Sequence, residues 1–365
     1  MQRRRRIALI ALAISLILPA AATACGGLFC QTVPVDQQAE RIIFTINGDG
    51  TISAYVQINY TGSAPDFSWV VPVPTVPEVG VAEMASFDEL SSLTAPVFLP
   101  PPVPTCALRP EAESRLFSTA AATDDVGVEV LAQGTAGPYA YEVVTSEDPK
   151  ALVVWLREHR YQITREMEPL VDVYTREGAV FLAMRLLPEA GTSTQDIQPV
   201  VMTYRGLRPT IPIRLTAVAA NPNMSIVTWI FADARAIPHN YAHPRVDERN
   251  LRNSPFSSDG TNYLSLLDRT VDLFLGRAFV TEYADGSAVF LAKKQPQDPL
   301  VVDLARRFDY VTRLFGRMSP EEMTRDPVFR VVHTLPPVTN IHDLANVDAK
   351  VYWGCVDRPI VIGSG

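Results

Sequence analysis

The sequence predicts an α+β fold of mainly antiparallel β-sheets, with a few covering helices and a more helical C-terminal region. The clearest signal lies in residues 40–60, where apolar and polar residues alternate around an Asn-Gly-Asp-Gly turn at 47–50. This pattern is typical of a β-hairpin with one buried face. Thirty prolines in 365 residues favour loop-rich β structure over a helical bundle. The chain lacks the strand–helix alternation of a Rossmann fold or a barrel.

Local signals place the other expected elements. Asp148 and Pro149 supply an N-cap and a first-turn proline for a helix that ends near His159, and Ser319 opens the capping box Ser-Pro-Glu-Glu. Prolines near its end predict that the strand 67–73 stops there or lies at a sheet edge. The other strands are expected at 126–131, 139–145 and 277–283, and in two hairpins, 170–175 with 179–187 and 211–220 with 225–232. The other helices are expected at 87–93, 263–274 and 300–314.

The first 24 residues have the pattern of a signal peptide. Four arginines at positions 3–6 precede an apolar run at 7–18, and small residues lead to an A-x-A cleavage site at 22–24. As a helix the apolar run is only about 18 Å long, too short for the ~30 Å hydrocarbon core of a membrane. We therefore expect cleavage after Ala24 and an extracytoplasmic protein, secreted or associated with the cell envelope. No transmembrane span is expected in the mature chain.

Charge and length narrow the class of protein further. Removing residues 1–24 takes away four arginines and no acid, so the net charge falls from −8 to −12. An acidic surface repels phosphate backbones, so nucleic acid is not an expected partner. The remaining chain of roughly 340 residues can form two or three domains. Composition divides it into four parts. A β-rich region that ends in a proline-rich loop (25–110) is followed by a linker (111–125), an α+β region with an antiparallel meander (126–250), and a helix-rich region with the tail (251–365).

Four cysteines are expected to form disulfides in an oxidising compartment: Cys25, Cys30, Cys106 and Cys355. Three pairings are possible, and proximity favours Cys25 with Cys30, which leaves Cys106 with Cys355. The long bridge would restrict the unfolded chain by about 4–5 kcal/mol. Structural zinc is disfavoured, because the cysteines form no C-x-x-C motif and have no nearby histidine. Lipid attachment at Cys25 is an alternative that Ala22 weakens, since a lipoprotein signal normally has leucine there.

No catalytic motif is present: G-x-S-x-G, H-E-x-x-H, G-x-x-x-x-G-K-[ST] and G-x-G-x-x-G are all missing from the sequence. One polar cluster is a candidate site, within residues 232–249: Asp233, Arg235, His239, His243 and Asp247. His239 and His243 are four residues apart, as helical metal ligands would be. However, Pro238 and Pro244 bracket them and disfavour a helix, so we interpret them as a surface pair. No metal and no cofactor is expected.

Four stretches carry a resemblance to a known family. They are Cys-Gly-Gly-Leu-Phe-Cys at 25–30 with 33–37, the stretch around Trp69 at 66–74, residues 276–283, and residues 310–314 continued by 319–329. Together they resemble the exported bacterial family known as domain of unknown function 2330, over nearly all of the mature chain. The resemblance implies a secreted or envelope-associated protein. It supplies no activity, ligand or catalytic residue.

Two functions remain open. The first is a non-enzymatic module that binds an unknown extracytoplasmic partner or forms part of the envelope, with one apolar or aromatic patch on a smooth surface. A deep cleft with convergent ionisable groups would count against it. The alternative is an exported hydrolase whose active site lies near residues 232–249. The absence of catalytic motifs favours the first, although whether the protein is an enzyme stays open. An acid and a histidine within about 2.6–3.2 Å of each other in a pocket would support the second.

Overall fold

The predicted hairpin is confirmed in the computed structural model, which describes residues 36–61, 68–105, 107–108, 129–161, 163–187, 198–257 and 259–356. Strands β1 (Asp36–Ile46) and β2 (Thr51–Thr61) are antiparallel neighbours. Side chains fix the turn between them. Asn47 Nδ2 donates to Thr51 Oγ1 at 2.9 Å, and Thr51 N donates to Asp49 Oδ1 at 2.9 Å. These are the local hydrogen bonds that make Asn and Asp common turn residues.

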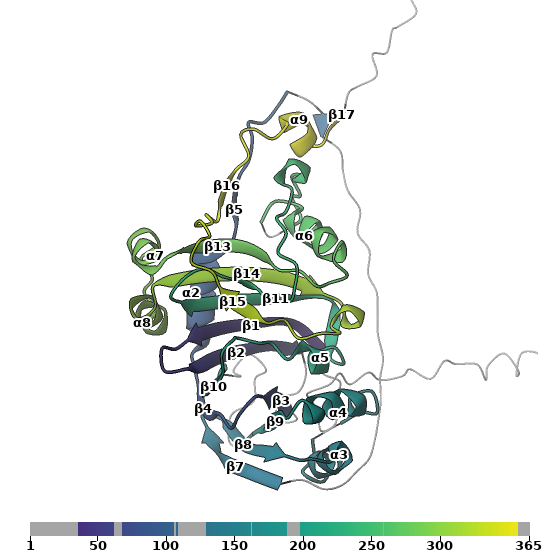
Figure 1. The fold of residues 1–365 in the computed structure, drawn as a ribbon. Helices are drawn as coiled ribbons and strands as arrows, with labels where there is room; N and C mark the ends of the chain where they lie inside the picture. Colours follow the sequence, from purple (N-terminus) through teal and green to yellow (C-terminus); the bar gives the residue numbers. More distant parts are fainter. Residues whose placement is uncertain are drawn as a thin grey trace, which may run out of the picture.

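The hairpin forms the middle of a seven-stranded sheet with the order β13-β14-β11-β1-β2-β10-β4 (Figure 1). The added strands are β4 (Glu78–Val81), β10 (Val200–Arg205), β11 (Ala220–Ala232), β13 (Val280–Gly286) and β14 (Tyr310–Met318). Neighbouring strands are antiparallel except β1 and β11, which run parallel. This one sheet therefore takes strands from each of the sequence regions 25–110, 126–250 and 251–365.

Both faces of the large sheet are buried, so the expectation of one buried face is wrong. On β1, Ile42 and Phe44 belong to one hydrophobic core and Ile43 to another. On β2, Ser53 and Gln57 are buried on the face opposite Val56 and its apolar neighbours. They are tolerated because they have polar partners: Ser53 shares a hydrogen bond of 2.9 Å with Thr203, and Gln57 accepts one from Arg41.

Four helices pack on the face that carries Ile43: α2 (Met84–Thr94), α6 (Tyr263–Asp272), α7 (Ser287–Lys294) and α8 (Pro299–Arg307). The helices predicted near 87–93 and 263–274 are confirmed as α2 and α6. The helix predicted for 300–314 is only half right, because α8 ends at Arg307 and β14 begins at Tyr310. Within β14, residues 311–316 are buried without interruption, as is typical of a strand covered on both sides.

A second, four-stranded sheet with two helices faces the other core. Its order is β3-β9-β8-β7, all antiparallel: β3 (Ser68–Val73), β9 (Val180–Leu186), β8 (Tyr139–Thr145) and β7 (Glu129–Ala136). β3 is an edge strand, as its prolines predict. Helix α3 (Pro149–Glu158) begins at the predicted N-cap, where Asp148 accepts a hydrogen bond of 2.9 Å from Lys150 N. Figure 1 shows this sheet with α3 and α4 (Glu168–Arg176) below the large one.

Both of the hairpins predicted for the middle of the chain need correction. Residues 170–175 lie in α4, and only 179–187 contains the expected strand, β9. Val171, Tyr174 and Thr175 are the buried residues of α4, at the i, i+3, i+4 spacing of a helix. Residues 213–216 form the short helix α5 (Ile213–Thr216). Strand β11 runs through the expected turn at 221–223, where a register shift against β1 accommodates Pro222.

The last third of the chain is not clearly more helical than the rest. It holds α6, α7, α8, α9 (Ala349–Tyr352) and the 3₁₀ turn η4 (Pro320–Glu322), but it also supplies β13 and β14. Another 3₁₀ turn, η3 (Glu248–Asn250), comes just before it. The capping box at Ser319 is confirmed at η4. Three two-stranded sheets complete the description: β12 (Ala236–Pro238) with β15 (Phe329–Val331), β5 (Val97–Leu99) with β16 (Ile341–Asp343), and β6 (Ala107–Leu108) with β17 (Cys355–Val356). Within the described ranges, the helices are too short or too polar to cross a membrane.

Candidate functional site

A cavity of about 280 Å³ lies between the two sheets. Strands β1, β2 and β10 form its floor, and β3, the turn after α4 and the segment around α5 enclose it. Most lining side chains are apolar, including Phe44, Trp69, Val71 and Met202. An apolar cavity of about 150 Å³ is large enough to bind benzene. This one therefore has room for a molecule about twice that size.

Glu40 is the buried acid of this cavity. It lies on β1, in the middle of the large sheet, and is only 5% exposed. Its Oε2 atom has no hydrogen-bond partner among the described residues. Burial raises the pKa of the Glu40 carboxyl to about 7, because the charged form loses its hydration. Near neutral pH the carboxyl is therefore about half protonated and is able to donate as well as accept a hydrogen bond.

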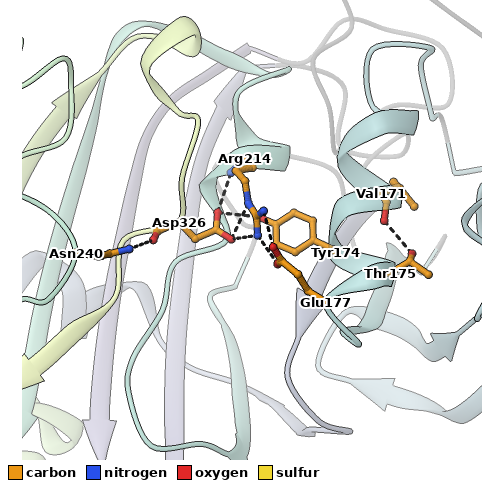
Figure 2. Close-up of polar contacts among 7 residues, drawn as sticks. All are labelled: Val171, Tyr174, Thr175, Glu177, Arg214, Asn240 and Asp326. Carbon is orange, nitrogen blue, oxygen red and sulfur yellow. Dashed lines mark hydrogen bonds and ion pairs between the residues drawn. The ribbon is translucent and has the colours of Figure 1, made fainter.

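An arginine network borders the same cavity (Figure 2). Arg214 of α5 donates from Nη2 to Glu177 Oε2 at 2.6 Å and from Nε to Asp326 Oδ2 at 3.0 Å. Tyr174 of α4 donates its hydroxyl hydrogen to Asp326 Oδ1 at 2.8 Å, and its ring lies 4.2 Å from the Arg214 guanidinium carbon. Asn240 holds the Asp326 segment through a hydrogen bond of 2.8 Å to its carbonyl oxygen. The network joins α4, α5 and the segment between η4 and β15.

The charges of this network are fixed by its own contacts. Burial opposes ionisation of Arg214, but hydrogen bonds with Glu177 and Asp326 outweigh it and raise the pKa of the guanidinium. The same hydrogen bonds lower the pKa of Glu177. Burial, followed by the negative charge of Asp326, raises the pKa of the Tyr174 hydroxyl. Tyr174 therefore stays a neutral donor, and Arg214 stays a cation between two carboxylates.

The polar cluster predicted from the sequence does not gather as a unit. Asp233 and His239 are exposed, and Asp247 is exposed and bonded to Arg249 at 2.8 Å. Only Arg235 and His243 come together, in a separate cleft of about 530 Å³.

This second cleft brings together groups from distant parts of the chain. Arg235 donates to the Pro336 carbonyl oxygen at 2.7 Å, and His243 Nε2 lies 2.7 Å from Thr281 Oγ1. Burial, and then the charges of Arg235 and Arg245, lower the pKa of His243 to about 4. Glu248 Oε1 lies 2.7 Å from Nδ1 of His342, so the cleft holds an acid and a histidine within hydrogen-bond reach.

Sequence reasoning missed both Glu40 and His342. Glu40 lies on the same face of β1 as Ile42 and Phe44, because alternate residues of a strand point to the same side. A charged residue at a position where the alternation predicts a buried apolar one was the signal that could have identified it. The predicted hairpin at 40–60 included Glu40 but did not mark it as a site residue. His342 is 94 residues from Glu248, and no local pattern links them.

The part of the chain that the structure covers shows how the possible metal ligands and one of the four cysteines are placed. There, no three His, Cys, Asp or Glu side chains gather as metal ligands would. Cys25, Cys30 and Cys106 lie outside the described residues, so lipid attachment at Cys25 and the pairing of the cysteines stay predictions. Cys355, at the start of β17, is disulfide-bonded.

Titration of Glu40 is expected to make stability depend on pH. Its folded pKa of about 7 lies above the ordinary value of 4.5, so its contribution to stability is full below pH 4.5 and lost as the pH rises through 7. The free energy of unfolding should fall by about 3 kcal/mol over that interval because of this group. Glu40→Gln should remove this slope in urea unfolding between pH 5 and 8. Glu147→Gln, at an exposed position, is the control; equal slopes for wild type and Glu40→Gln would contradict the assignment.

Comparison with known proteins identifies the family and nothing finer. Neither a curated protein nor a solved structure matches the chain. One family matches, over residues 19–330, and its description is "uncharacterized protein conserved in bacteria". This range includes Glu40, Arg214 and the residues of the cavity that surround them. Because the match covers most of its length, the chain belongs to the bacterial family known as domain of unknown function 2330.

Proposed function

We propose that this protein is an exported, non-enzymatic binding protein that holds a small apolar ligand between its two sheets. Export is supported by the signal-peptide pattern of residues 1–24. Binding is supported by one observation above all: an apolar cavity of about 280 Å³ that contains a buried carboxyl, one oxygen of which has no hydrogen-bond partner among the residues that the structure describes. Ligand sites are typically apolar with a few polar groups that fix orientation.

The chemistry of the cavity defines the class of ligand. Its apolar lining favours a hydrocarbon or aromatic body, since burial of each Å² of apolar surface contributes about 25 cal/mol. Glu40 favours a molecule with one hydroxyl or carbonyl group, because a ligand partner would remove the cost of burying its carboxyl unsatisfied. A permanently anionic ligand is disfavoured, because the carboxyl is itself half ionised near pH 7.

The Arg214 network provides the route by which such a ligand would enter. Tyr174, Glu177 and Asp326 line the cavity, and Arg214 bridges them. The Glu177 side chain is 54% exposed, whereas that of Asp326 is 10% exposed. Of the two contacts of Arg214, the one with Glu177 is the more exposed to water, so it is the one that we expect to open first.

Calorimetry with naphthalene and 2-naphthol tests the proposal, because the two probes differ by a single hydroxyl. Both should bind, and the naphthol about tenfold more tightly, since a hydrogen bond to Glu40 contributes about 1–1.5 kcal/mol. Glu40→Leu should remove this preference. Ala54→Leu, which reduces the cavity, should weaken both probes, whereas Ala345→Leu at an exposed site should change neither. Dissociation constants above 1 mM for both probes would refute the proposal.

Hydrolysis stays the second candidate because of the cleft near residues 232–249. There the Thr281 hydroxyl lies 2.7 Å from His243, and His342 is bonded to Glu248. A hydroxyl beside a neutral histidine is the arrangement of a nucleophile and its base. Turnover of an ester that His243→Gln abolishes, with naphthol binding unchanged, would favour this alternative over the first.

A further inference from the structure

The turn that follows α6 presents three consecutive large apolar side chains to solvent. Leu273, Phe274 and Leu275 are 81%, 43% and 75% exposed. We call residues 273–275 the α6 turn. It is the longest run of exposed large apolar residues within the described ranges. Single exposed leucines are common on protein surfaces, but a contiguous group of exposed apolar residues indicates a surface that binds a protein or a membrane.

The backbone of the α6 turn is fixed rather than loose. Phe274 N donates to the Val271 carbonyl oxygen and Leu275 N to that of Asp272, each at 2.9 Å. Leu275 has a φ of 54°, a conformation that bulky side chains rarely adopt. Gly276 follows at a φ of 73°, and a Cβ atom there would lie 2.3 Å from Glu322. The chain thus holds the two leucines outward at a local energetic cost.

Arginines lie beside the α6 turn. Arg245, Arg252 and Arg269 line a shallow cleft of about 720 Å³ together with Leu273 and Phe274. Asp247 also lines it, but Arg249 neutralises that carboxylate through hydrogen bonds of 2.8 and 2.9 Å.

The cleft is therefore lined by three arginines and one neutralised carboxylate, so its surface is net positive. The nearest other acids are Asp272, beside the turn, and Glu322, which lies against Gly276. The whole chain, in contrast, carries a net charge of −8. Charge complementarity therefore requires an anionic occupant.

We propose that the α6 turn docks on an anionic lipid surface. Leu273 and Leu275 would enter the boundary between headgroups and acyl chains, and the arginines would contact lipid phosphates. Protruding apolar side chains ringed by cations are the features that bind peripheral proteins to such membranes. Arginine suits this position because its aliphatic part packs on apolar surface while its charge stays at the headgroups. The surface is separate from the ligand cavity and does not depend on it.

Sedimentation with lipid vesicles tests this assignment. Vesicles of phosphatidylglycerol and phosphatidylcholine (3:7) should bind the protein at least tenfold more tightly than pure phosphatidylcholine. Leu273→Ser with Leu275→Ser should reduce binding at least tenfold, and Arg245→Gln with Arg269→Gln should reduce both the binding and its salt dependence. All four residues are exposed, so these variants are expected to fold.

Leu207→Ser is the matched control, because Leu207 is 91% exposed and lies outside the α6 turn and its cleft. Its binding should equal that of the wild type. Equal binding to the two vesicle types would overturn the proposal, as would full binding by the double leucine variant. A large fall in the urea unfolding midpoint of the double leucine variant would instead indicate misfolding, and the arginine pair would then decide.

Discussion

Replacement of Glu282 by leucine is expected to lower the free energy of unfolding by about 3–5 kcal/mol. Glu282 of β13 and Arg313 of β14 form an ion pair with an Nε–Oε2 distance of 2.6 Å, and their side chains are 1% and 6% exposed. Tyr263 donates its hydroxyl hydrogen to the other oxygen of Glu282 at 2.7 Å. Removing the carboxylate leaves a buried guanidinium without its counter-charge and a buried tyrosine without its acceptor.

The position of this pair explains why the loss would be large. The Arg313 guanidinium carbon lies 5.4 Å from the centre of a Trp229 ring, and Trp229 donates to Thr94 at 2.9 Å. Arg313 also reaches the Ser91 carbonyl oxygen at 3.3 Å. The pair thus connects α2 and α6 to three strands of the large sheet through buried contacts that water cannot replace.

A double-mutant cycle in urea distinguishes the broken pair from simple loss of packing. Glu282→Leu with Arg313→Met should be less destabilised than Glu282→Leu alone, because apolar replacement of both partners removes the unpaired charge. Asp303→Ala breaks the exposed pair between Asp303 and Arg307, whose side chains are about half exposed, and should cost less than about 1 kcal/mol. A Glu282→Leu loss as small as that of Asp303→Ala would show that the pair contributes nothing.

Elements with their own local signals could be predicted from the sequence. The turn at 47–50, the N-cap at Asp148 and the capping box at Ser319 are set by hydrogen bonds within a few residues of each other. The sequence-based prediction failed where two local signals compete. In 170–175 a short apolar run before Gly178 suits a hairpin, but burial of Val171, Tyr174 and Thr175 gives a helix. Tertiary packing decides between them.

Features that depend on distant pairing could not be predicted. The parallel contact of β1 with β11 sets the middle of the large sheet, yet the residues paired there, such as Ile43 and Trp229, are almost 190 positions apart in the sequence. The cavity arises where this sheet meets β3 and α4, so no single segment carries its pattern. Cysteines and histidines are candidate site residues from their chemistry alone. Glu40 becomes a candidate only because it is buried, and the sequence of one strand does not show that burial.

The C-terminal segment supports the second large prediction, a bond between Cys106 and Cys355. Residues 340–356 run beside 95–108: β16 pairs with β5, Trp353 donates to the Pro101 carbonyl oxygen at 3.0 Å, and β17 pairs with β6. In that last pair Cys355 lies opposite Leu108, and Val356 opposite Ala107, the residue that follows Cys106. Cys355 is disulfide-bonded, and because β17 pairs with the strand that directly follows Cys106, Cys106 is the partner we expect.

Loss of that bond is expected to lower the free energy of unfolding by about 5 kcal/mol, because the bridge closes a loop of about 250 residues. Cys106→Ser, Cys355→Ser and the double variant should all show the same loss in urea unfolding, since each removes one bond. Cys30→Ser should cost only about 2 kcal/mol, because Cys25 and Cys30 close a short loop. Peptide mapping without reduction should recover the peptide that contains Cys106 linked to the peptide that contains Cys355. Disulfides of this kind persist only outside a reducing cytoplasm, so four free thiols in the purified protein would remove the support for export together with that for the bridge.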